Sequence, residues 1–505
     1  MLRSSLLKSI SNICSYSTLL CSGSLPTIYA LSTPPGQKSA IAVIRITGSH
    51  CKYIYQKLTG LKENLNPRQT ILRRIYRKGN NTSRILLDNP LILYFKSPKS
   101  FTGEDILELH LHGGKSVTNG VLNTIQSFND RDSGLEIRHA LPGEFSLRAF
   151  QNSKFDLTEI EGIKELIDAE TESQRRSALS SFMGENKIKF LEWRTRIINN
   201  IAQLAAIIDF GDDTEIENIN HILNNVEEKI IELEKEIQKF IKKVEKASIL
   251  QDGIRLALLG TPNTGKSSLI NSIVNDDVSI VSNIPGTTRD SVGTTVNING
   301  YKVIICDTAG IREQTTDEIE LLGIEKAKEK VEQSDICLVL IDPSNRPLVS
   351  DELVKFLSSS KMQNKHIRIV INKADLVNNK SELITLRNTL KEKYGQLAPV
   401  NVISCLTKSG VETLIEELTI SFKSMSTNSD DSNPTIVSER VKDILINDVL
   451  YGIEAFRKNN RNNKDVVIMS ESLRYAVDGI GKITGNTVGV EEVLETVFAN
   501  FCVGK

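Results

Sequence analysis

The sequence predicts a multidomain protein of mixed α/β and α+β class. We expect a strand-rich N-terminal domain, a helical bundle domain, and a doubly wound sheet domain inserted into the bundle. The chain has 505 residues, enough for roughly two to four domains. From residue 254 to about residue 423, short apolar runs alternate with helical patterns, as in a parallel sheet covered by helices. Helical periodicity precedes this region and resumes after residue 434, so the sheet domain interrupts a helical one.

The composition is that of an ordinary globular chain, with 39% hydrophobic residues, 25% charged residues and a net charge of −1. A protein that grips RNA along its whole length is expected to be basic, so any RNA contact must come from a local patch or from a second protein. No run of eighteen apolar residues occurs, so no membrane span is expected. The seven cysteines are scattered without metal-ligand spacing.

Residues 1–24 predict a mitochondrial transit peptide. Acidic residues are absent before Glu63, and the leader carries Arg3 and Lys8 among serines and spaced leucines. A secretory signal fits less well, because Ser, Asn and Lys repeatedly interrupt the apolar stretch. Import into the mitochondrial matrix is the resulting expectation.

The N-terminal domain is expected over residues 25–153. Apolar, β-branched runs at Ala40–Ile46 and Leu91–Phe95 predict strands. The segment Asn64–Asn89 has few core signals and is consistent with a loop or a hairpin.

Two histidines in this domain have the spacing that places both on one side of a strand. They are His110 and His112, separated by Leu111. A metal pair is conceivable, but no third ligand is evident, so ordinary hydrogen-bonded histidines are expected.

The helical domain is expected in two parts, over residues 154–250 and 425–505. Between Val226 and Val244, apolar residues recur at four-three spacing with Glu and Lys between them, which indicates an amphipathic helix. About three heptads are weak evidence for a coiled coil, so packing within a bundle is favoured. Ser424–Pro434 is polar and is interpreted as a linker.

The sheet domain is expected over residues 251–424, and its apolar runs predict parallel strands. These strands are expected at Ile254–Leu259, Val303–Cys306, Ile336–Ile341, Ile367–Ile371 and Val400–Ile403.

A phosphate-binding loop follows the first of these strands. Residues 260–267, GTPNTGKS, match G-x-x-x-x-G-K-[ST] between a predicted strand and a helix start. The glycines let main-chain N–H groups surround phosphate oxygens at a helix N-terminus, which favours negative charge. Lys266 is expected to reach the β and γ phosphates, and Ser267 to bind Mg²⁺. The predicted nucleotide contacts here are Gly260, Asn263, Thr264, Gly265, Lys266, Ser267 and Ser268.

Three later motifs predict that the nucleotide is GTP. The first, Asp307-Thr-Ala-Gly310, ends a strand and places a carboxylate beside the metal. The second, Asn372-Lys373-Ala-Asp375, also ends a strand, and its final carboxylate can accept two hydrogens that guanine offers and adenine does not. The third is Ser404-Cys405, where a main-chain N–H can meet the guanine carbonyl. Their order and spacing match the Ras-like GTP-binding domains.

A switch region is predicted between the phosphate loop and Asp307. Thr287 and Thr288 in PGTTRD are expected to contact the nucleotide, with Thr288 as a ligand of Mg²⁺. The alternative is that this segment is a plain Pro-Gly turn. Lys266 and Thr288 are therefore candidate catalytic residues. Small Ras-like GTPases carry Gln after the D-T-A-G stretch to orient water, whereas this chain has Ile311. An alkyl side chain cannot hydrogen-bond, so water and charge compensation must come from elsewhere.

Several long motifs in one order resemble a known family, from about Ile28 to Lys505. These motifs are TPPG at Thr33–Gly36, AVIRITG at Ala42–Gly48, SFTGEDILELHLHGG at Ser100–Gly114, PGEFSLRAFQNSKFDL at Pro142–Leu157 and DEIELLGIEKA at Asp317–Ala327. The chain resembles the tRNA-modification GTPases known in bacteria as MnmE or TrmE, in their mitochondrial form.

The resemblance implies a folate-binding N-terminal domain, a helical domain, and a G domain inserted in the helical domain. It implies a GTPase that acts with an FAD-dependent partner on the wobble uridine of certain tRNAs. The modification is a carboxymethylaminomethyl-type group at C5, built with a one-carbon unit from 5-formyl- or methylene-tetrahydrofolate. It also implies a homodimer whose G domains pair.

Site residues carry over from the family by motif. Asn263, Ser282, Ile284 and Thr287 match the K⁺ ligands, although Ser282 stands where Thr is usual. Glu320 matches the residue that positions water, and a K⁺ ion would compensate charge as an arginine finger does. The folate contacts are matched by Arg45, Glu108, Lys154 and Lys505. For Cys502, near the end of the chain, a chemical role and a buried structural thiol both remain open.

The competing interpretation is a GTP switch that only assists the assembly of mitochondrial RNA particles. The G domain alone does not separate the two, because assembly GTPases share its motifs. The N-terminal E-L-H-L-H-G-G and P-G-E-F motifs do separate them, because assembly factors lack both.

Overall fold

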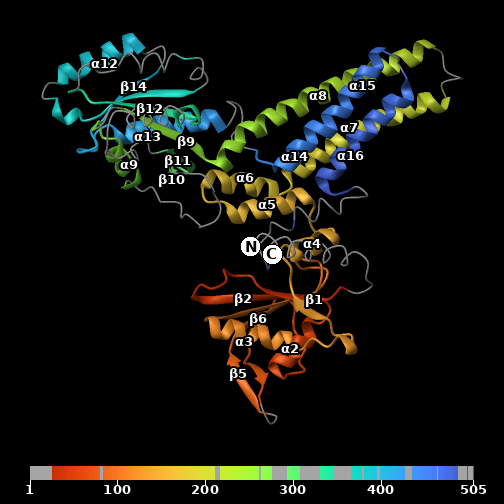
Figure 1. Ribbon diagram of the computed structural model, residues 1–505. Helices are drawn as coiled ribbons and strands as arrows, with labels where there is room; N and C mark the ends of the chain where they lie inside the picture. The colour runs from red at the N-terminus through yellow and green to blue at the C-terminus, as the bar shows by residue number, and fades with distance from the viewer. Residues whose placement is uncertain are drawn as a thin grey trace, which may run out of the picture. The chain divides into compact units, whose positions relative to one another are not determined.

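The computed structural model describes residues 25–79, 83–210, 216–260, 263–275, 293–306, 330–344, 359, 365–377, 380–394, 398–426, 435–462, 465–486, 498 and 504. The chain divides into two compact units (Figure 1). The first consists of Met1–Lys164, Gly184–Val226 and Asp443–Lys505, and the second of Glu165–Met183 and Glu227–Lys442.

The first unit contains a six-stranded sheet in the order β3-β6-β7-β2-β1-β8. Its strands are β1 (Thr27–Leu31), β2 (Ser39–Thr47), β3 (Ile71–Leu72), β6 (Leu91–Phe95), β7 (Ile106–Gly113) and β8 (Ile137–His139). Neighbouring strands are antiparallel, except that β1 and β8 are parallel. The two strands predicted in this domain are confirmed as β2 and β6. Within Asn64–Asn89, where the sequence left a loop or a hairpin open, β4 (Ile75–Lys78) and β5 (Arg84–Asp88) form a hairpin.

Two helices, α2 (Cys51–Thr59) and α3 (Lys115–Gln126), cover one face of this sheet (Figure 1). Side chains alternate between the two faces along a strand. The core residues that pack against the helices include Ile44, Ile46, Leu107, Leu109 and Leu111. Arg45, Glu108 and His110 alternate with them and therefore belong to the opposite face. Part of this opposite face is covered where Phe145 of α4 (Glu144–Gln151) packs with Ile28 and Ala30.

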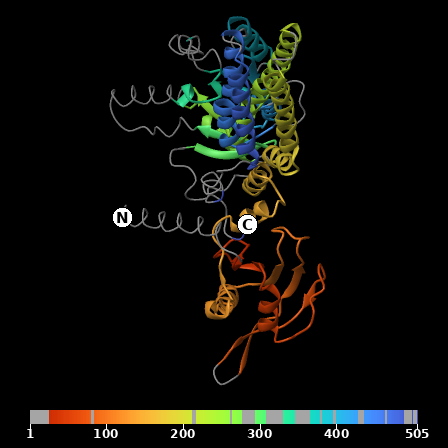
Figure 2. The same ribbon diagram turned by 90° about the vertical axis from the view of Figure 1, so that its right-hand side faces the viewer.

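Three helices of the first unit run side by side, namely α7 (Glu185–Phe210), α15 (Tyr451–Asn462) and α16 (Val466–Thr484) (Figure 2). Asp465 caps α16 by accepting hydrogen bonds from the amides of Val467 and Ile468. The helix ends at Gly485, whose left-handed backbone glycine adopts without strain. Before α15, the chain forms α14 (Glu439–Ile444) and a π-helical turn over Leu445–Leu450.

The predicted amphipathic helix is confirmed as part of α8 (Ile216–Asp252). The apolar positions of its four-three pattern are buried, as expected for packing in a bundle: Val226, Ile230, Leu233, Ile237, Phe240 and Val244. Two further helices precede it, α5 (Leu157–Asp168) and α6 (Glu172–Phe182).

The second unit contains a six-stranded sheet in the order β10-β11-β9-β12-β13-β14. Its strands are β9 (Ile254–Leu259), β10 (Gly293–Ile298), β11 (Tyr301–Cys306), β12 (Ile336–Ile341), β13 (His366–Ile371) and β14 (Val400–Val402). Helices α9 (Lys266–Asn275) and α13 (Val411–Ser426) pack on one face, and α12 (Lys380–Tyr394) packs on the other. The doubly wound parallel sheet predicted from the sequence is therefore present.

Two details of this unit differ from the sequence prediction. The edge strand β10 was not predicted, and it pairs antiparallel with β11. The linker expected to begin at Ser424 begins later, because α13 continues to Ser426. The hydroxyls of Ser424 and Ser426 donate to main-chain oxygens one turn earlier, at 2.8 and 2.9 Å, and Met425 packs against the core. These contacts keep a polar sequence helical.

Helix α6 contacts the turn between β10 and β11. The amide of Ser173 donates to the oxygen of Gly300 at 3.3 Å. Just before the helix, Glu170 forms an ion pair of 2.9 Å with Lys302 on β11. The hairpin is thus joined to α6 by a main-chain hydrogen bond and by a charge pair.

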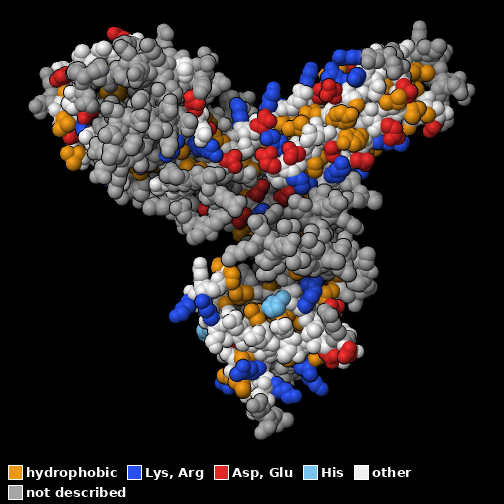
Figure 3. Space-filling view, viewed as in Figure 1, with side chains coloured by type: hydrophobic (Ala, Val, Ile, Leu, Met, Phe, Trp, Pro, Cys, Tyr) orange, Lys and Arg blue, Asp and Glu red, His pale blue; other side chains and the backbone are white. Residues whose placement is uncertain are grey.

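The described helices include none that is long and apolar enough to cross a membrane. Acidic and basic side chains are interspersed on the visible surface of α7, α15 and α16 (Figure 3). This mixture agrees with the net charge of −1.

Candidate functional site

The phosphate loop joins β9 to α9, and its described residues form a closed turn. Lys266 Nζ donates to the main-chain oxygen of Gly260 at 2.7 Å. Gly265 has a φ of +91°, and a Cβ there would lie 2.2 Å from Asn372 Nδ2. Only glycine fits this approach without strain. Asn263 and Ser267 are exposed, so both can reach a phosphate or a cation.

The guanine motif lies at the carboxyl end of β13, next to the phosphate loop. Asn372 is buried, and its Nδ2 donates to the main-chain oxygen of Thr264 at 2.9 Å. The amide of Cys405 donates to Asn372 Oδ1 at 3.3 Å. Ser404 Oγ donates to Asp375 Oδ1. The structure therefore brings together the predicted residues of the phosphate loop, the guanine motif and the Ser404-Cys405 turn.

Asp342, at the end of β12, was missed by the sequence argument. Its Oδ2 lies 2.8 Å from Lys373 Nζ, and the amide of Ser344 donates to its Oδ1 at 2.9 Å. Burial acts to raise the pKa of Asp342, but the hydrogen bonds from Lys373 and Ser344 outweigh it and leave the pKa lowered. The ionised carboxylate therefore holds the Lys373 side chain in place. An acidic residue that ends a buried strand was the signal that could have revealed it.

Several predicted residues lie outside the described part of the chain. They are Ser282, Ile284, Thr287, Thr288, Asp307, Gly310, Glu320, Cys502 and Lys505.

A second candidate site lies on the face of the N-terminal sheet opposite α2 and α3. β2 and β7 pair so that Arg45 stands opposite Glu108. Arg45 Nε and Nη2 contact Glu108 Oε1 at 2.9 and 2.8 Å, and the guanidinium lies 5.8 Å from the ring centroid of Phe101. Both charged side chains are mostly buried, with 21% and 13% of their surface exposed. Arg45 and Glu108, each predicted as a folate contact, therefore contact each other.

The third predicted folate residue, Lys154, forms its hydrogen bond elsewhere. Lys154 Nζ donates to the main-chain oxygen of Pro98 at 3.0 Å, so it contacts the segment that carries Phe101. Lys505 itself is not described, but Ser32 Oγ donates to the oxygen of the preceding Gly504 at 3.1 Å. Ser32 directly follows β1, the neighbour of β2. Gly504 therefore lies beside the sheet that carries Arg45.

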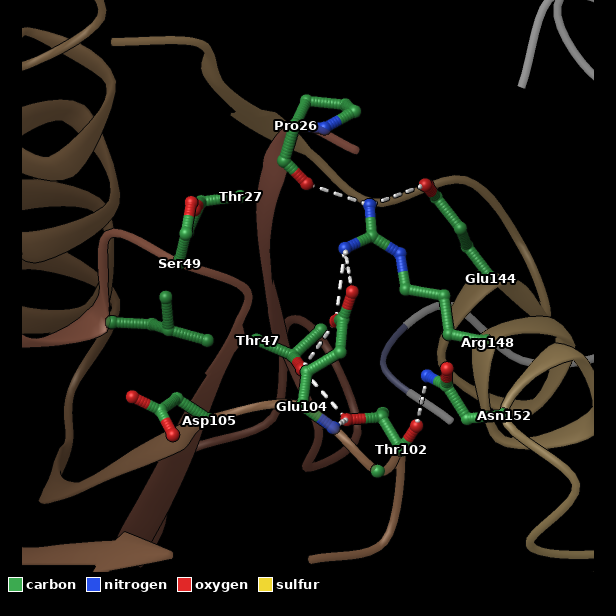
Figure 4. Close-up of polar contacts among 12 residues, drawn as sticks. Pro26, Thr27, Thr47, Ser49, Thr102, Glu104, Asp105, Glu144, Arg148 and Asn152 are labelled. Carbon is green, nitrogen blue, oxygen red and sulfur yellow. Dashed lines mark hydrogen bonds and ion pairs between the residues drawn. The ribbon is translucent and has the colours of Figure 1, made fainter. Parts of the chain in front are cut away.

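A buried charge cluster anchors the segment next to this site (Figure 4). Arg148 of α4 is 1% exposed and donates to both oxygens of Glu104, to Glu144 and to the main-chain oxygen of Pro26. Asn152 Nδ2 donates to the oxygen of Thr102 at 2.7 Å. These contacts fix residues 102–104, which adjoin Phe101, against α4. The sequence did not predict this cluster, although the two motifs that contain Glu104 and Arg148 were recognised.

His110 and His112 differ in their hydrogen bonding. His112 Nδ1 lies 2.7 Å from Asp88 Oδ1, as expected for an ordinary hydrogen-bonded histidine. The same expectation is wrong for His110. Its Nε2 is buried without a hydrogen-bond partner, although Glu108 Oε2 lies 3.4 Å away. The described residues contain no group of three side chains arranged to bind a metal ion.

Comparison with known proteins identifies the family. A family model described as the MnmE helical domain matches residues 157–502, and one described as the GTP-binding protein TrmE N-terminus matches residues 27–154. The chain belongs to the MnmE/TrmE family. Like its relatives, this MnmE/TrmE chain is a GTPase, with the phosphate loop and guanine motif assembled as such an enzyme requires.

Relatives match nearly the whole of this MnmE/TrmE chain. A mitochondrial tRNA modification GTPase of Saccharomyces cerevisiae is 56% identical, over 95% of this chain and 93% of its own. One of Schizosaccharomyces pombe is 37% identical, over 95% and 96%. A mitochondrial 5-taurinomethyluridine-[tRNA] synthase subunit of Danio rerio is 35% identical, over 96% and 95%. These names agree with the predicted mitochondrial location.

Among solved structures, Aquifex aeolicus Era bound to GDP and AlF4⁻ matches with a TM-score of 0.27 and 26% identity. The match covers 40% of this chain and 66% of that one.

Proposed function

We propose that this chain is a K⁺-dependent GTPase of the mitochondrial matrix that modifies C5 of the wobble uridine in mitochondrial tRNAs. It acts as a homodimer with an FAD-dependent partner subunit. The one-carbon unit comes from a tetrahydrofolate derivative, and the product carries a carboxymethylaminomethyl-type group. The G domain, residues 251–424, is inserted between helical segments 154–250 and 425–505, after a leader of residues 1–24 and a folate-binding domain of residues 25–153.

One combination of features supports this proposal most strongly: the chain carries a guanine-nucleotide site and, in a separate domain, the Arg45–Glu108 pair on the sheet face opposite α2 and α3. A carboxylate suits the amino and ring N–H donors of a pterin, and cations suit the glutamate tail. Glu108 Oε1 is taken by Arg45, while Oε2 makes no hydrogen bond with its neighbour His110. The residues present therefore fit a folate, with Lys154 and Lys505 as the tail contacts.

The metal ligands follow from the same motifs. Ser267 and Thr288 would hold Mg²⁺, and Asn263 with Ser282, Ile284 and Thr287 would hold K⁺. Mg²⁺ and K⁺ supply positive charge that offsets the charge developing on the phosphates. Lys266 orients the β and γ phosphates, and Glu320 orients the attacking water.

The test is mass spectrometry of nucleosides from mitochondrial tRNA in a strain that lacks this gene. We expect the C5-modified wobble uridine to disappear, and to return with the wild-type gene but not with Glu108→Ala or Asp375→Asn. His112→Ala, on the same sheet as Glu108, is the matched control and should restore the modification. Normal modification in the deletion strain would contradict the proposal and favour an assembly role.

A further inference from the structure

His110 occupies a defined position on the face of the N-terminal sheet opposite α2 and α3. In the sheet register, His110 of β7 stands opposite Val43 of β2 on one side and Leu91 of β6 on the other. Directly opposite residues of antiparallel strands point to the same face. The imidazole is thus flanked by two apolar side chains, and it lies one position along the face from Glu108.

Two polar side chains on this face, Glu108 and His110, have hydrogen-bonding atoms without a hydrogen-bond partner among the described residues. Arg45 contacts Glu108 only at Oε1. Glu108 Oε2 and His110 Nε2 lie 3.4 Å apart without forming a hydrogen bond, and the buried Nε2 has no other hydrogen-bond partner. Buried polar atoms are normally paired, so an unpaired ring nitrogen beside a half-used carboxylate points to a ligand that pairs with both.

The order of these groups matches one edge of a pterin. That edge presents an amino group and a ring N–H as donors, followed by the 4-oxo oxygen as an acceptor. A carboxylate accepts from the donors, and a neutral imidazole with its proton on Nε2 donates to the acceptor.

We propose that His110 is a specificity-determining residue of the folate site, donating from Nε2 to the 4-oxo oxygen of the pterin while Glu108 Oε2 accepts from its N–H groups. This inference rests on the proposed folate-binding function and adds a contact to it. His110 therefore contacts the pterin ring itself, whereas Lys154 and Lys505 would contact only the glutamate tail.

Binding of 5-formyl-tetrahydrofolate to the purified full chain tests this assignment. His110→Leu removes the donor and leaves a buried ligand oxygen unpaired, so affinity should fall roughly 5- to 150-fold. His110→Gln keeps an N–H donor and should stay within about threefold, because the hydrogen bond can be re-formed. His112→Leu, on the same strand but 76% exposed and paired with Asp88, should leave affinity unchanged.

A second measurement separates a direct hydrogen bond from a packing effect. With 5-formyl-tetrahydrofolate labelled with ¹³C at C4, the isotope-edited infrared band of the 4-oxo group should lie at lower frequency in wild type than in His110→Leu. An unmoved band, or equal affinity losses in His110→Leu and His112→Leu, would overturn the role of His110. Absence of any binding to the wild-type chain would instead remove the proposed folate site, and this inference with it.

Discussion

Asn372 and Thr264 are 108 residues apart in sequence, yet Asn372 Nδ2 donates to the main-chain oxygen of Thr264 at 2.9 Å. The first belongs to the guanine motif and the second to the phosphate loop. The hydrogen bond is buried and directly joins the two halves of the nucleotide site.

The first prediction concerns this bond. Asn372→Ala leaves the oxygen of Thr264 without its donor, which should weaken GTP binding roughly 5- to 150-fold, the equivalent of about 1–3 kcal/mol. Titration with a fluorescent GTP analogue would measure the change. Thr385→Ala, at an exposed position of α12, is the control and should bind GTP with wild-type affinity. Equal affinities for the two variants would show that the bond does not organise the loop.

Guanine recognition is expected to depend on Asp375. Asp375→Asn replaces an acceptor with a donor, so the variant should lose GTP selectivity and gain affinity for xanthosine triphosphate. Competition binding with the two nucleotides measures the switch. Unchanged GTP affinity would remove Asp375 from the guanine site.

The buried Arg148 should be critical for stability. Arg148→Met leaves Glu104 without its arginine partner and Glu144 with Arg138 alone, and breaking a buried pair typically costs about 3–5 kcal/mol. Arg175→Met removes an arginine that also pairs with a carboxylate, Glu172, but on the surface, and it should have no measurable effect. Denaturant unfolding gives the free energy of unfolding of both variants. An Arg148→Met protein as stable as wild type would show that the cluster does not stabilise the fold.

The cluster should also make the N-terminal domain sensitive to acid. Burial acts to raise the pKa of Glu144, but the hydrogen bonds and charge of Arg138, with the charge of Arg148, leave it lowered from 4.5. A lowered folded-state pKa stabilises the fold above the ordinary pKa, and this stability is lost as pH falls through the folded-state value.

Glu144→Gln removes the titrating group. The free energy of unfolding of the variant should therefore be lower than that of wild type at pH 7, and this difference should shrink below about pH 4.5. Hydrogen–deuterium exchange of peptides from β1 and α4 measures the difference locally. A difference that stays constant from pH 7 to about pH 3.5 would contradict the assignment.

Hydrolysis is expected to depend on K⁺ and on Glu320. Loss of charge compensation by an arginine finger lowers GTPase rates by about 10³–10⁵, so replacing K⁺ with Na⁺ should have a large effect. Asn263→Ala should abolish the K⁺ preference, and Glu320→Ala should lower turnover with nucleotide affinity nearly unchanged. GTP turnover at equal ionic strength, over a range of protein concentrations, tests all three. Equal rates in both salts would exclude a K⁺-assisted mechanism.

The sequence was most informative where one local signal decided the structure. The strands Ile254–Leu259 and Ile336–Ile341 have the predicted bounds, because continuous apolar runs between turns leave few alternatives. The edge strand β10 has a weaker signal, since Thr and Asn interrupt its pattern.

Contacts between distant residues were the part that could not be predicted. Arg148 lies 44 residues from Glu104, and its place on a helix gives no sign that the charge is buried. Asp342 and Lys373 come from two different strand ends. The missing hydrogen bond at His110 depends on side-chain angles, which residue type and spacing do not specify.

The junction between α6 and the β10–β11 hairpin has a thermodynamic consequence. In sequence the hairpin lies between residues 276–292, which carry several of the proposed metal ligands, and residues 307–329, which carry Glu320, proposed to orient the attacking water. If a nucleotide favours one position of the hairpin, that preference acts on α6 through Gly300 and Lys302. Linkage is reciprocal, so whatever restrains α6 changes nucleotide affinity by the same factor. On that condition, a ligand that orders α6 would also change how tightly GTP is bound.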